Sequence, residues 1–243
     1  MTRSGRNVAV AALLTAASAA GAQETSENLC RQAPRLSEGA ASGPGRIVGA
    51  GRVRFVRDGL ARKGCPDADP ACAAQGYLVP GDRVVLGERR KGYVCATFPQ
   101  MKTGLDTTGW LPEAAVDPEP ATPVTREAWL GVWTRVEARI AIEAGAEPGT
   151  VAIDGSATWG AGDPERAQRG SVHLGEIGGT VAPADGALSF AMGEKGTLPL
   201  AKGGELDCKV WMRRVGPWLV VDDNLACGGL NVSFRGVYRL EGT

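Results

Sequence analysis

Six cysteines and a single histidine are the residues with the clearest chemical potential in this sequence of 243 residues. No two cysteines have the two-to-four-residue spacing that zinc sites favour, and His173 stands alone. An even number of cysteines instead predicts disulfides if the chain is exported, because thiols are oxidised outside the cytoplasm. We therefore expect no metal ion and no cofactor.

The cysteine positions also predict which residues pair: Cys65 with Cys72, Cys208 with Cys227, and Cys30 with Cys95. The first pair encloses a short stretch rich in Pro and Asp, which are turn formers that can bring its ends together. The second pair flanks a predicted hairpin, and closing that loop would contribute about 3 kcal/mol. The third pair follows by elimination and would fasten the N-terminal segment to the first domain.

The remaining reactive side chains do not form a recognisable catalytic motif. His173 lies three residues before Glu176 and near Ser171, an arrangement that many β proteins offer by chance. A Gly-x-Ser-x-Gly nucleophile turn is missing from the sequence. Asp67 and Asp69 could contact calcium, but two carboxylates fall short of a full ligand set and favour a solvated turn. We therefore expect a protein that is not an enzyme.

The first 22 residues predict export. Arg3 and Arg6 precede an apolar stretch, Val8–Leu14, and Ala20-Gly21-Ala22 provides an A-x-A cleavage site. This pattern is typical of a secretory signal peptide, so we expect a periplasmic or secreted protein. The 27 basic residues balance 27 acidic ones, which argues against nucleic-acid binding. No apolar run reaches the ~20 residues of a membrane span.

Four short segments of the first half combine turn residues with alternating strands: GRIVGAGRVRFV (45–56), YLVPGDRVVLGER (77–89), GYVCATF (92–98) and TGWLPEAAV (108–116). Pro80-Gly81-Asp82 supplies turn chemistry before a strand, and Lys91-Gly92 turns the chain into the paired strand. In this order the segments resemble bacterial SH3 (SH3b) domains. The sequence departs from the family in having Tyr93 where Trp is frequent, and in the long insertion 61–76.

The resemblance implies a small barrel that docks on peptidoglycan or on a peptide. Aromatic residues offer large rigid contact areas, so the candidates to line a groove are Tyr77, Tyr93, Phe98 and Trp110. The alternative is that these rings form the core of the small barrel.

The second half reads as a series of short β strands separated by Gly, Pro and Asp clusters. We expect strands at 136–144, 149–159, 171–177, 187–192, 206–214, 218–222 and 231–240. Gly131-Val132-Trp133 resembles the first strand of lipocalin-like and avidin-like barrels. The ending 222–240 resembles the tail of exported bacterial proteins with an SH3b-like part.

The fold expected from these patterns is all-β, a small SH3-like barrel followed by an antiparallel meander barrel or sandwich. The expected divisions are a signal peptide (1–22), an irregular segment (23–45), the SH3b-like domain (46–116), a Pro-rich linker (117–125) and the second β domain (126–243). The five tryptophans of the second domain could line a ligand cavity or fill a core: Trp129, Trp133, Trp159, Trp211 and Trp218. Asp222-Asp223-Asn224 suggests a tight turn beside a disulfide or a polar site.

The expected function is non-catalytic binding at the cell envelope, with the first domain docking on peptidoglycan or peptide. The second domain would then bind a protein partner or a small ligand. One alternative is an inhibitor of a lysozyme or a protease, which should carry a protruding polar loop, with Gly160–Gly170 as the candidate. Another is an SH3b-targeted cell-wall hydrolase that uses His173 and acidic residues such as Asp163 and Glu165.

Overall fold

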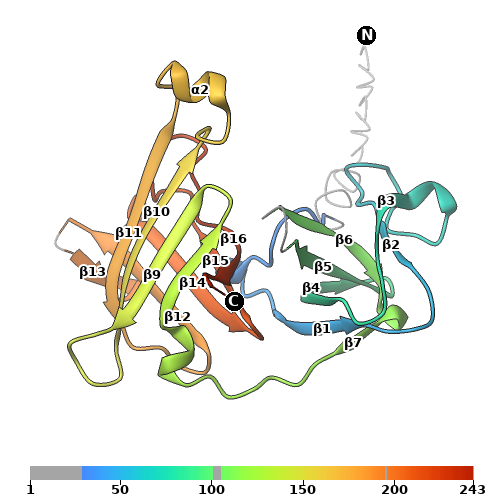
Figure 1. The fold of residues 1–243 in the computed structure, drawn as a ribbon, viewed down its shortest axis with the longest axis horizontal. Helices are drawn as coiled ribbons and strands as arrows, with labels where there is room; N and C mark the ends of the chain where they lie inside the picture. The colour runs from blue at the N-terminus through green and yellow to red at the C-terminus, as the bar shows by residue number, and fades with distance from the viewer. Residues whose placement is uncertain (1–28, 101–104, 195, 243) are drawn as a thin grey trace, which may run out of the picture.

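The computed structural model describes residues 29–100, 105–194 and 196–242, so the predicted signal peptide lies outside the described residues. The fold is all-β, as predicted, and consists of two antiparallel sheets (Figure 1). Among the described residues, no helix is long and apolar enough to cross a membrane.

The first sheet has seven strands in the order β3-β2-β6-β5-β4-β1-β7. These strands are β1 (Gly43–Ile47), β2 (Val53–Val56), β3 (Ala73–Leu78), β4 (Arg83–Arg90), β5 (Tyr93–Pro99), β6 (Asp106–Pro112) and β7 (Val116–Pro118). Strand β1 begins inside the segment that was expected to be irregular, and β7 uses the first residues of the expected linker. Lys91 and Gly92 form the turn between β4 and β5 with φ angles of 53° and 78°.

Apolar side chains from the inner face of this sheet form the core of the first domain, which is here called the first barrel after the SH3-like barrel that the sequence predicts. Its buried members are Ile47, Phe55, Leu78, Val84, Leu86, Val94, Ala96, Leu111 and Val116. Short 3-10 helices, η2 (Pro70–Cys72) and η3 (Glu113–Ala115), precede β3 and β7.

The second sheet has nine strands in the order β11-β10-β9-β8-β16-β15-β14-β12-β13. They are β8 (Gly131–Arg135), β9 (Ala138–Ala144), β10 (Val151–Trp159), β11 (His173–Val181), β12 (Ala187–Gly193), β13 (Gly196–Leu198), β14 (Cys208–Val215), β15 (Trp218–Asp223) and β16 (Gly236–Leu240). Strand β11, at one end of the order, also contacts β12 and β13 at the other end, so the sheet nearly closes into a barrel.

The strand expected over 231–240 is wrong in its first half, because β16 begins only at Gly236. Ser233 and Phe234 donate hydrogen bonds to the Asp223 carboxylate, which takes this stretch out of the sheet. The loop 224–235 therefore folds over one end of the barrel. It contributes the buried side chains of Cys227, Val232 and Phe234 to the core of the second barrel.

The interior of the second barrel is filled by large side chains. Trp129, from the 3-10 helix η4 (Arg126–Trp129), and Trp133 of β8 are both fully buried. The Trp133 Nε1 donates to the Trp129 carbonyl at 2.8 Å, and the Arg214 guanidinium lies 4.1 Å from the Trp133 ring centroid. Burial lowers the pKa of Arg214 to about 10. Trp129 and Trp133 are thus core residues.

The three disulfides have the pairings predicted from the sequence: Cys30–Cys95, Cys65–Cys72 and Cys208–Cys227. Such bonds are typical of proteins from oxidising compartments such as the periplasm or the cell exterior.

The segment 29–42, here called the strap, lies between the two barrels. Its Ala33 and Leu36 share one apolar cluster with residues of both barrels, namely Val85, Val215, Trp218, Val220 and Val237. Ser37, in the 3-10 helix η1 (Leu36–Glu38), donates from its backbone N and its Oγ to the Asp222 Oδ2 at 2.9 and 2.6 Å. The strap is thereby bonded to the second barrel, while the Cys30–Cys95 disulfide bonds it to the first.

Asp222 is fully buried and ion-paired, so removing its charge should destabilise the protein. Its Oδ1 accepts from the Arg235 Nε at 2.5 Å. Because Asp222→Asn leaves Arg235 without this partner, we expect the free energy of unfolding to fall by about 3 kcal/mol at pH 7 in urea titrations. The matched control is Glu38→Gln, an exposed partner of Arg35, which should cost less than about 1 kcal/mol.

The loss of unfolding free energy caused by Asp222→Asn should also depend on pH. Burial raises the pKa of Asp222, but hydrogen bonds from Ser37 and Arg235 outweigh burial and leave the pKa below its usual value. The stabilisation is then complete above the unfolded pKa of about 4 and is lost as the pH falls through the lower folded value. The difference between wild type and Asp222→Asn should therefore shrink below about pH 4; a constant difference would contradict this assignment.

Candidate functional site

Three of the four aromatic residues predicted to bind a ligand project from the same, outer face of the first sheet. In the pairing of β5 with β6, Tyr93 lies opposite Pro112. Trp110 is two residues from Pro112 on β6, so the side chains of Tyr93 and Trp110 project from the same face of the sheet. The same side continues across β2 to Tyr77 of β3, which lies opposite Arg54. Phe98 lies five residues after Tyr93 on β5, so its side chain projects from the opposite, inner face and packs against the core of the first barrel.

These residues differ in how much of their surface is accessible. Trp110 is fully buried, although it lies on the outer face, and its neighbour Cys95 carries the disulfide to the strap. Tyr93 is partly buried, and burial together with the nearby Asp67 of the insertion raises its pKa. Tyr77 is 44% exposed, with the Arg52 guanidinium 4.3 Å from its ring centroid.

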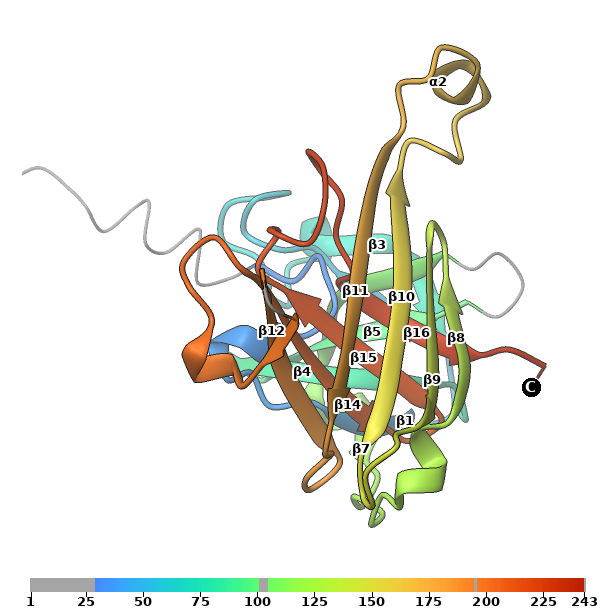
Figure 2. The same ribbon diagram turned by 90° about the vertical axis from the view of Figure 1, so that its left-hand side faces the viewer.

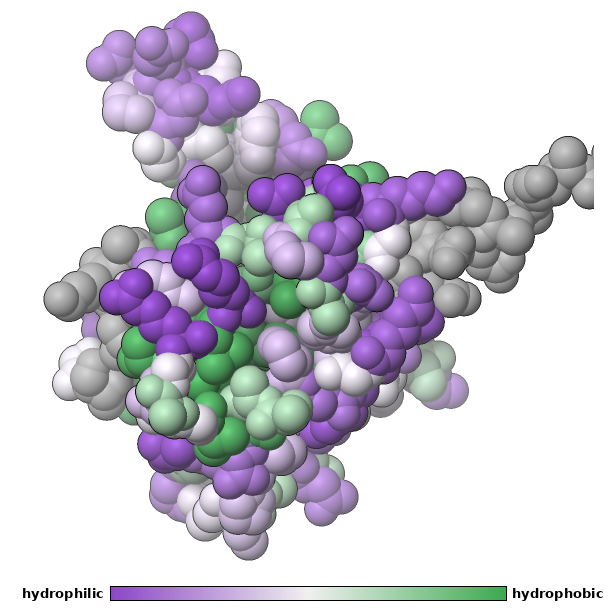
Figure 3. Space-filling view, turned by 90° about the vertical axis from the view of Figure 1, so that its right-hand side faces the viewer, coloured by the Kyte–Doolittle hydropathy of each residue, from purple (hydrophilic) through white to green (hydrophobic). Residues whose placement is uncertain are grey.

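The structure therefore does not gather the four aromatic residues into one groove. Tyr77 and Tyr93 keep accessible surface, and they are three strands apart, which corresponds to roughly 14 Å. Figure 3 shows the side of the molecule on which the first sheet lies, with an apolar area bordered by hydrophilic residues.

The acidic turn of the insertion has a structural role. The Asp67 Oδ1 accepts from the Asp69 N at 2.9 Å, and the Asp69 Oδ1 accepts from the Ala71 N at 2.8 Å, which caps η2. Among the described residues, no group of three or more His, Cys, Asp or Glu side chains could hold a metal ion.

The most prominent feature of the second barrel is the hairpin of β10 and β11, which extends beyond the other strands (Figures 1 and 2). Its tip carries the short helix α2 (Pro164–Gln168). Residues 161–171 are exposed, apart from the half-buried Arg166. This tip coincides with Gly160–Gly170, the stretch in which a protruding polar loop was expected.

Local hydrogen bonds give the tip a fixed shape. The Asp163 Oδ1 caps α2 by accepting from the backbone N of Glu165 and Arg166 at 3.0 and 3.2 Å. The Gly162 N donates to the Glu137 Oε1 at 2.9 Å, which ties the tip to the turn between β8 and β9. The Arg166 guanidinium lies 4.4 Å from the Trp159 ring centroid at the end of β10. A loop held in this way loses little entropy on binding.

Exposed leucines surround the base of this hairpin. Strand β11 begins, β15 ends and β14 begins at the same end of the barrel, here called the hairpin end. It carries four leucines with large exposed fractions: Leu174 (67%), Leu206 (89%), Leu225 (60%) and Leu230 (74%). Surface leucines are ordinary when scattered, but several at one end of a domain indicate an interaction surface.

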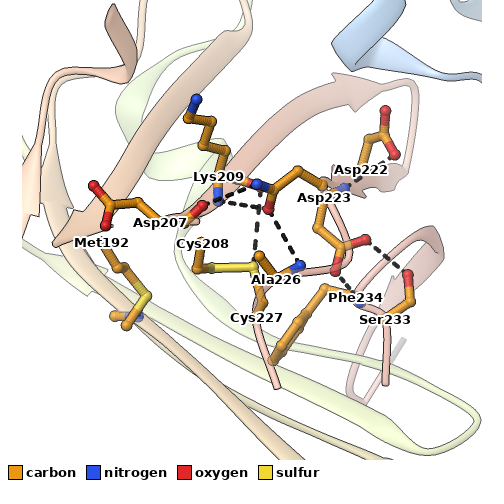
Figure 4. Close-up of a disulfide and its surroundings, with 12 residues drawn as sticks. Met192, Asp207, Cys208, Lys209, Asp222, Asp223, Ala226, Cys227, Ser233 and Phe234 are labelled. Atoms are coloured by element: carbon orange, nitrogen blue, oxygen red, sulfur yellow. Dashed lines mark hydrogen bonds between the residues drawn. A yellow bond between two sulfur atoms is a disulfide. The ribbon is translucent and has the colours of Figure 1, made fainter. Parts of the chain in front are cut away.

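The two loops that carry three of these leucines are fastened to each other. The Cys208–Cys227 disulfide joins the start of β14 to the loop 224–235 (Figure 4). The Asn224 Oδ1 accepts from the Lys209 N, and its Nδ2 donates to the Asp207 carbonyl, both at 2.9 Å. Leu206 precedes Asp207 and Leu225 follows Asn224 in the chain. These hydrogen bonds therefore fix the backbone beside both leucine side chains.

The loop 224–235 is also fastened to the hairpin and to the barrel. The Leu174 carbonyl accepts from the Gly229 N at 2.9 Å, and the Leu230 carbonyl is hydrogen-bonded to the His173 ring. At the other end of the loop, the buried Asp223 carboxylate accepts from the Ser233 Oγ at 2.7 Å. Burial raises the pKa of Asp223.

His173 takes part in this packing. Its ring lies 5.4 Å from the Trp159 ring, measured between centroids, and its Nδ1 contacts the Leu230 carbonyl. Glu176 lies three residues further along β11 and therefore projects from the opposite face of the strand. His173 and Glu176, which are close in the sequence, are thus not brought together in the structure.

The remaining tryptophans lie in three different surroundings. Trp218 belongs to the apolar cluster between the barrels, and Trp159 lies at the base of the hairpin tip. Trp211 lines a surface cavity of about 380 Å³ together with Leu36 of the strap and Arg213. The five tryptophans therefore do not line a common ligand cavity.

Comparison of the chain with protein-family models, with curated proteins and with solved structures gave no match. The resemblance to SH3b domains thus rests on the sequence motifs alone.

The leucines of the hairpin end were not identified by sequence reasoning, although a signal was present. Leu206 stands between Glu205 and Asp207, and Leu230 stands between Gly229 and Asn231. Leu206 was expected at the start of the strand 206–214, but β14 begins only at Cys208 and leaves it in a loop. A large apolar residue in such a loop has no regular element that would bury it.

Proposed function

We propose that the protein is an exported, non-catalytic binding protein of the cell envelope. In this proposal the hairpin end of the second barrel binds a protein partner, and the first barrel docks on peptidoglycan or on a peptide. The observation that carries the proposal is the hairpin end, where a fixed polar tip lies near four exposed leucines, three of them on loops joined by a disulfide.

A protein partner fits this end of the barrel better than a small ligand. The loop 224–235 covers the barrel end and places Val232 and Phe234 in the core, so the interior is occupied by side chains. Fixed loops with exposed apolar residues and a polar surround match the composition of protein interfaces. The polar tip extends beyond the leucines, which would hold them away from a flat membrane surface.

The contribution of the first barrel is inferred from the accessible aromatic residues. Tyr77 and Tyr93 present ring surface on the outer face of the sheet, and such rings are common in contacts with sugars and peptides.

Site-specific crosslinking of the full-length mature protein tests the hairpin end. A photoreactive phenylalanine analogue at Leu230 should give a discrete adduct with an envelope protein, which disappears when Leu174→Ser is added. The matched control is the same analogue at Leu60, an exposed leucine of the first barrel, 62% accessible. Identical adduct patterns at both positions, or no adduct at Leu230, would contradict the assignment.

The same protein mixed with protein-free peptidoglycan sacculi tests the first barrel. We expect it to co-sediment and expect Tyr77→Ala to lower the bound fraction, whereas Leu230→Ser should not change it. Failure to sediment would remove peptidoglycan as the ligand of the first barrel and leave the hairpin result unaffected.

A second candidate function, inhibition of a lysozyme or a protease, is favoured by the shape of the hairpin tip. A rigid projecting loop can enter the cleft of an enzyme, and its fixed conformation would be the main source of affinity.

Inhibition assays with a c-type lysozyme and a trypsin-like protease at micromolar protein test this second function. Asp163→Ala removes the cap of α2, worth about 1 kcal/mol, and should weaken inhibition about fivefold. Glu143→Ala removes an exposed side chain of β9 away from the tip, and inhibition should be unchanged. Flat activity curves for both enzymes would remove this candidate.

A further inference from the structure

Strand β3 is an edge strand with one unpaired side. It stands at the end of the strand order of the first sheet and pairs only with β2, on its inner side. Figure 1 shows it on the side of the first barrel that faces away from the second barrel. Gln75, Gly76 and Tyr77 are exposed, so the middle of the strand is accessible.

This edge lacks two of the features that usually prevent another strand from pairing, although its pairing with β2 shifts register between Arg54 and Val56. Proteins protect exposed edges with charged side chains, prolines, bulges or very short strands. The sequence of β3, Ala-Ala-Gln-Gly-Tyr-Leu, has six residues without a charge or a proline. Such an edge can accept a further strand through main-chain hydrogen bonds.

The strand next to this edge carries unpaired positive charge. Arg52, Arg54 and Arg57 lie on or beside β2 and are exposed. In the described part of the chain no carboxylate lies within ion-pair distance of their guanidinium groups. Arg54 lies opposite Tyr77 in the β2–β3 pairing, and Arg52 contacts the Tyr77 ring, so both are beside the open edge.

We propose that β3 binds an extended, acidic segment of a protein partner by strand addition. The main chain of the segment would pair with the open edge. Its carboxylates would meet Arg52 and Arg54 on the outer face, and its apolar residues, which alternate with the carboxylates, would lie on the opposite face. The proposal deepens, and rests on, the peptide-docking role proposed for the first barrel. A protein segment is favoured over glycan because only a peptide main chain can continue the ladder.

Hydrogen exchange with a defined peptide tests this inference on the full-length mature protein. The probe is a capped eight-residue peptide of alternating Glu and Val. We expect it to slow amide exchange in residues 74–78 at least several-fold, since the added ladder protects these groups. A peptide with an N-methyl group at every residue should give no protection, because neither of its edges keeps an N–H group to donate to the ladder.

Charge controls separate strand addition from general electrostatic attraction. The matching Lys and Val peptide should bind about tenfold more weakly, as should the acidic peptide to the Arg52→Glu, Arg54→Glu variant. The control is Arg169→Glu at the exposed hairpin tip, which should leave peptide binding unchanged. The inference is overturned if the N-methylated peptide binds equally well, if charge reversal has no effect, or if β3 is not protected.

These outcomes are distinct from failure of the proposed function. Absence of crosslinks at Leu230 concerns the hairpin end and leaves the peptide result valid. Binding to sacculi without protection of β3 would keep a docking role for the first barrel and overturn strand addition.

Discussion

The hydrogen bonds between Ser37 of the strap and the buried Asp222 carboxylate hold the two barrels in one arrangement. Asp222 is satisfied only when the strap lies in place, because Ser37 supplies two of its hydrogen bonds and Arg235 a third. A buried carboxylate that lost these donors would be strongly unfavourable. The strap is in turn bonded to the first barrel by the Cys30–Cys95 disulfide and by the Arg31–Asp58 ion pair. Arg239 of the second barrel also pairs directly with Asp106 of the first, at 2.7 Å.

The fixed arrangement of the two barrels determines where the two candidate surfaces lie. The hairpin end belongs to the second barrel and the open edge of β3 to the first, and neither includes residues of the apolar cluster between the barrels. Under the proposed function both surfaces can be occupied at once, and their fixed arrangement would raise the effective concentration of one partner near the other.

The sequence predicted the all-β class, two of the disulfide pairs and the position of the projecting loop from local patterns, and the pair Cys30–Cys95 by elimination. It predicted that the N-terminal segment is fastened to the first domain but not that it bonds to the second barrel, since the pairing of Ser37 with Asp222 spans 185 residues and has no local signal. Nor did the alternation of apolar and polar residues over 231–240 indicate that Ser233 and Phe234 donate hydrogen bonds to Asp223 instead of joining β16. All four aromatic candidates lie in the first sheet, and the faces of Phe98 and Trp110 depend on strand register and on what covers the sheet.

If the strap makes the two barrels one cooperative unit, they should unfold together, and differential scanning calorimetry of the disulfide-intact protein tests this most directly. We expect a single transition with a ratio of calorimetric to van't Hoff enthalpy of about one. Two resolved transitions, each with the enthalpy expected for one barrel, would show that the domains unfold independently and would contradict the claim.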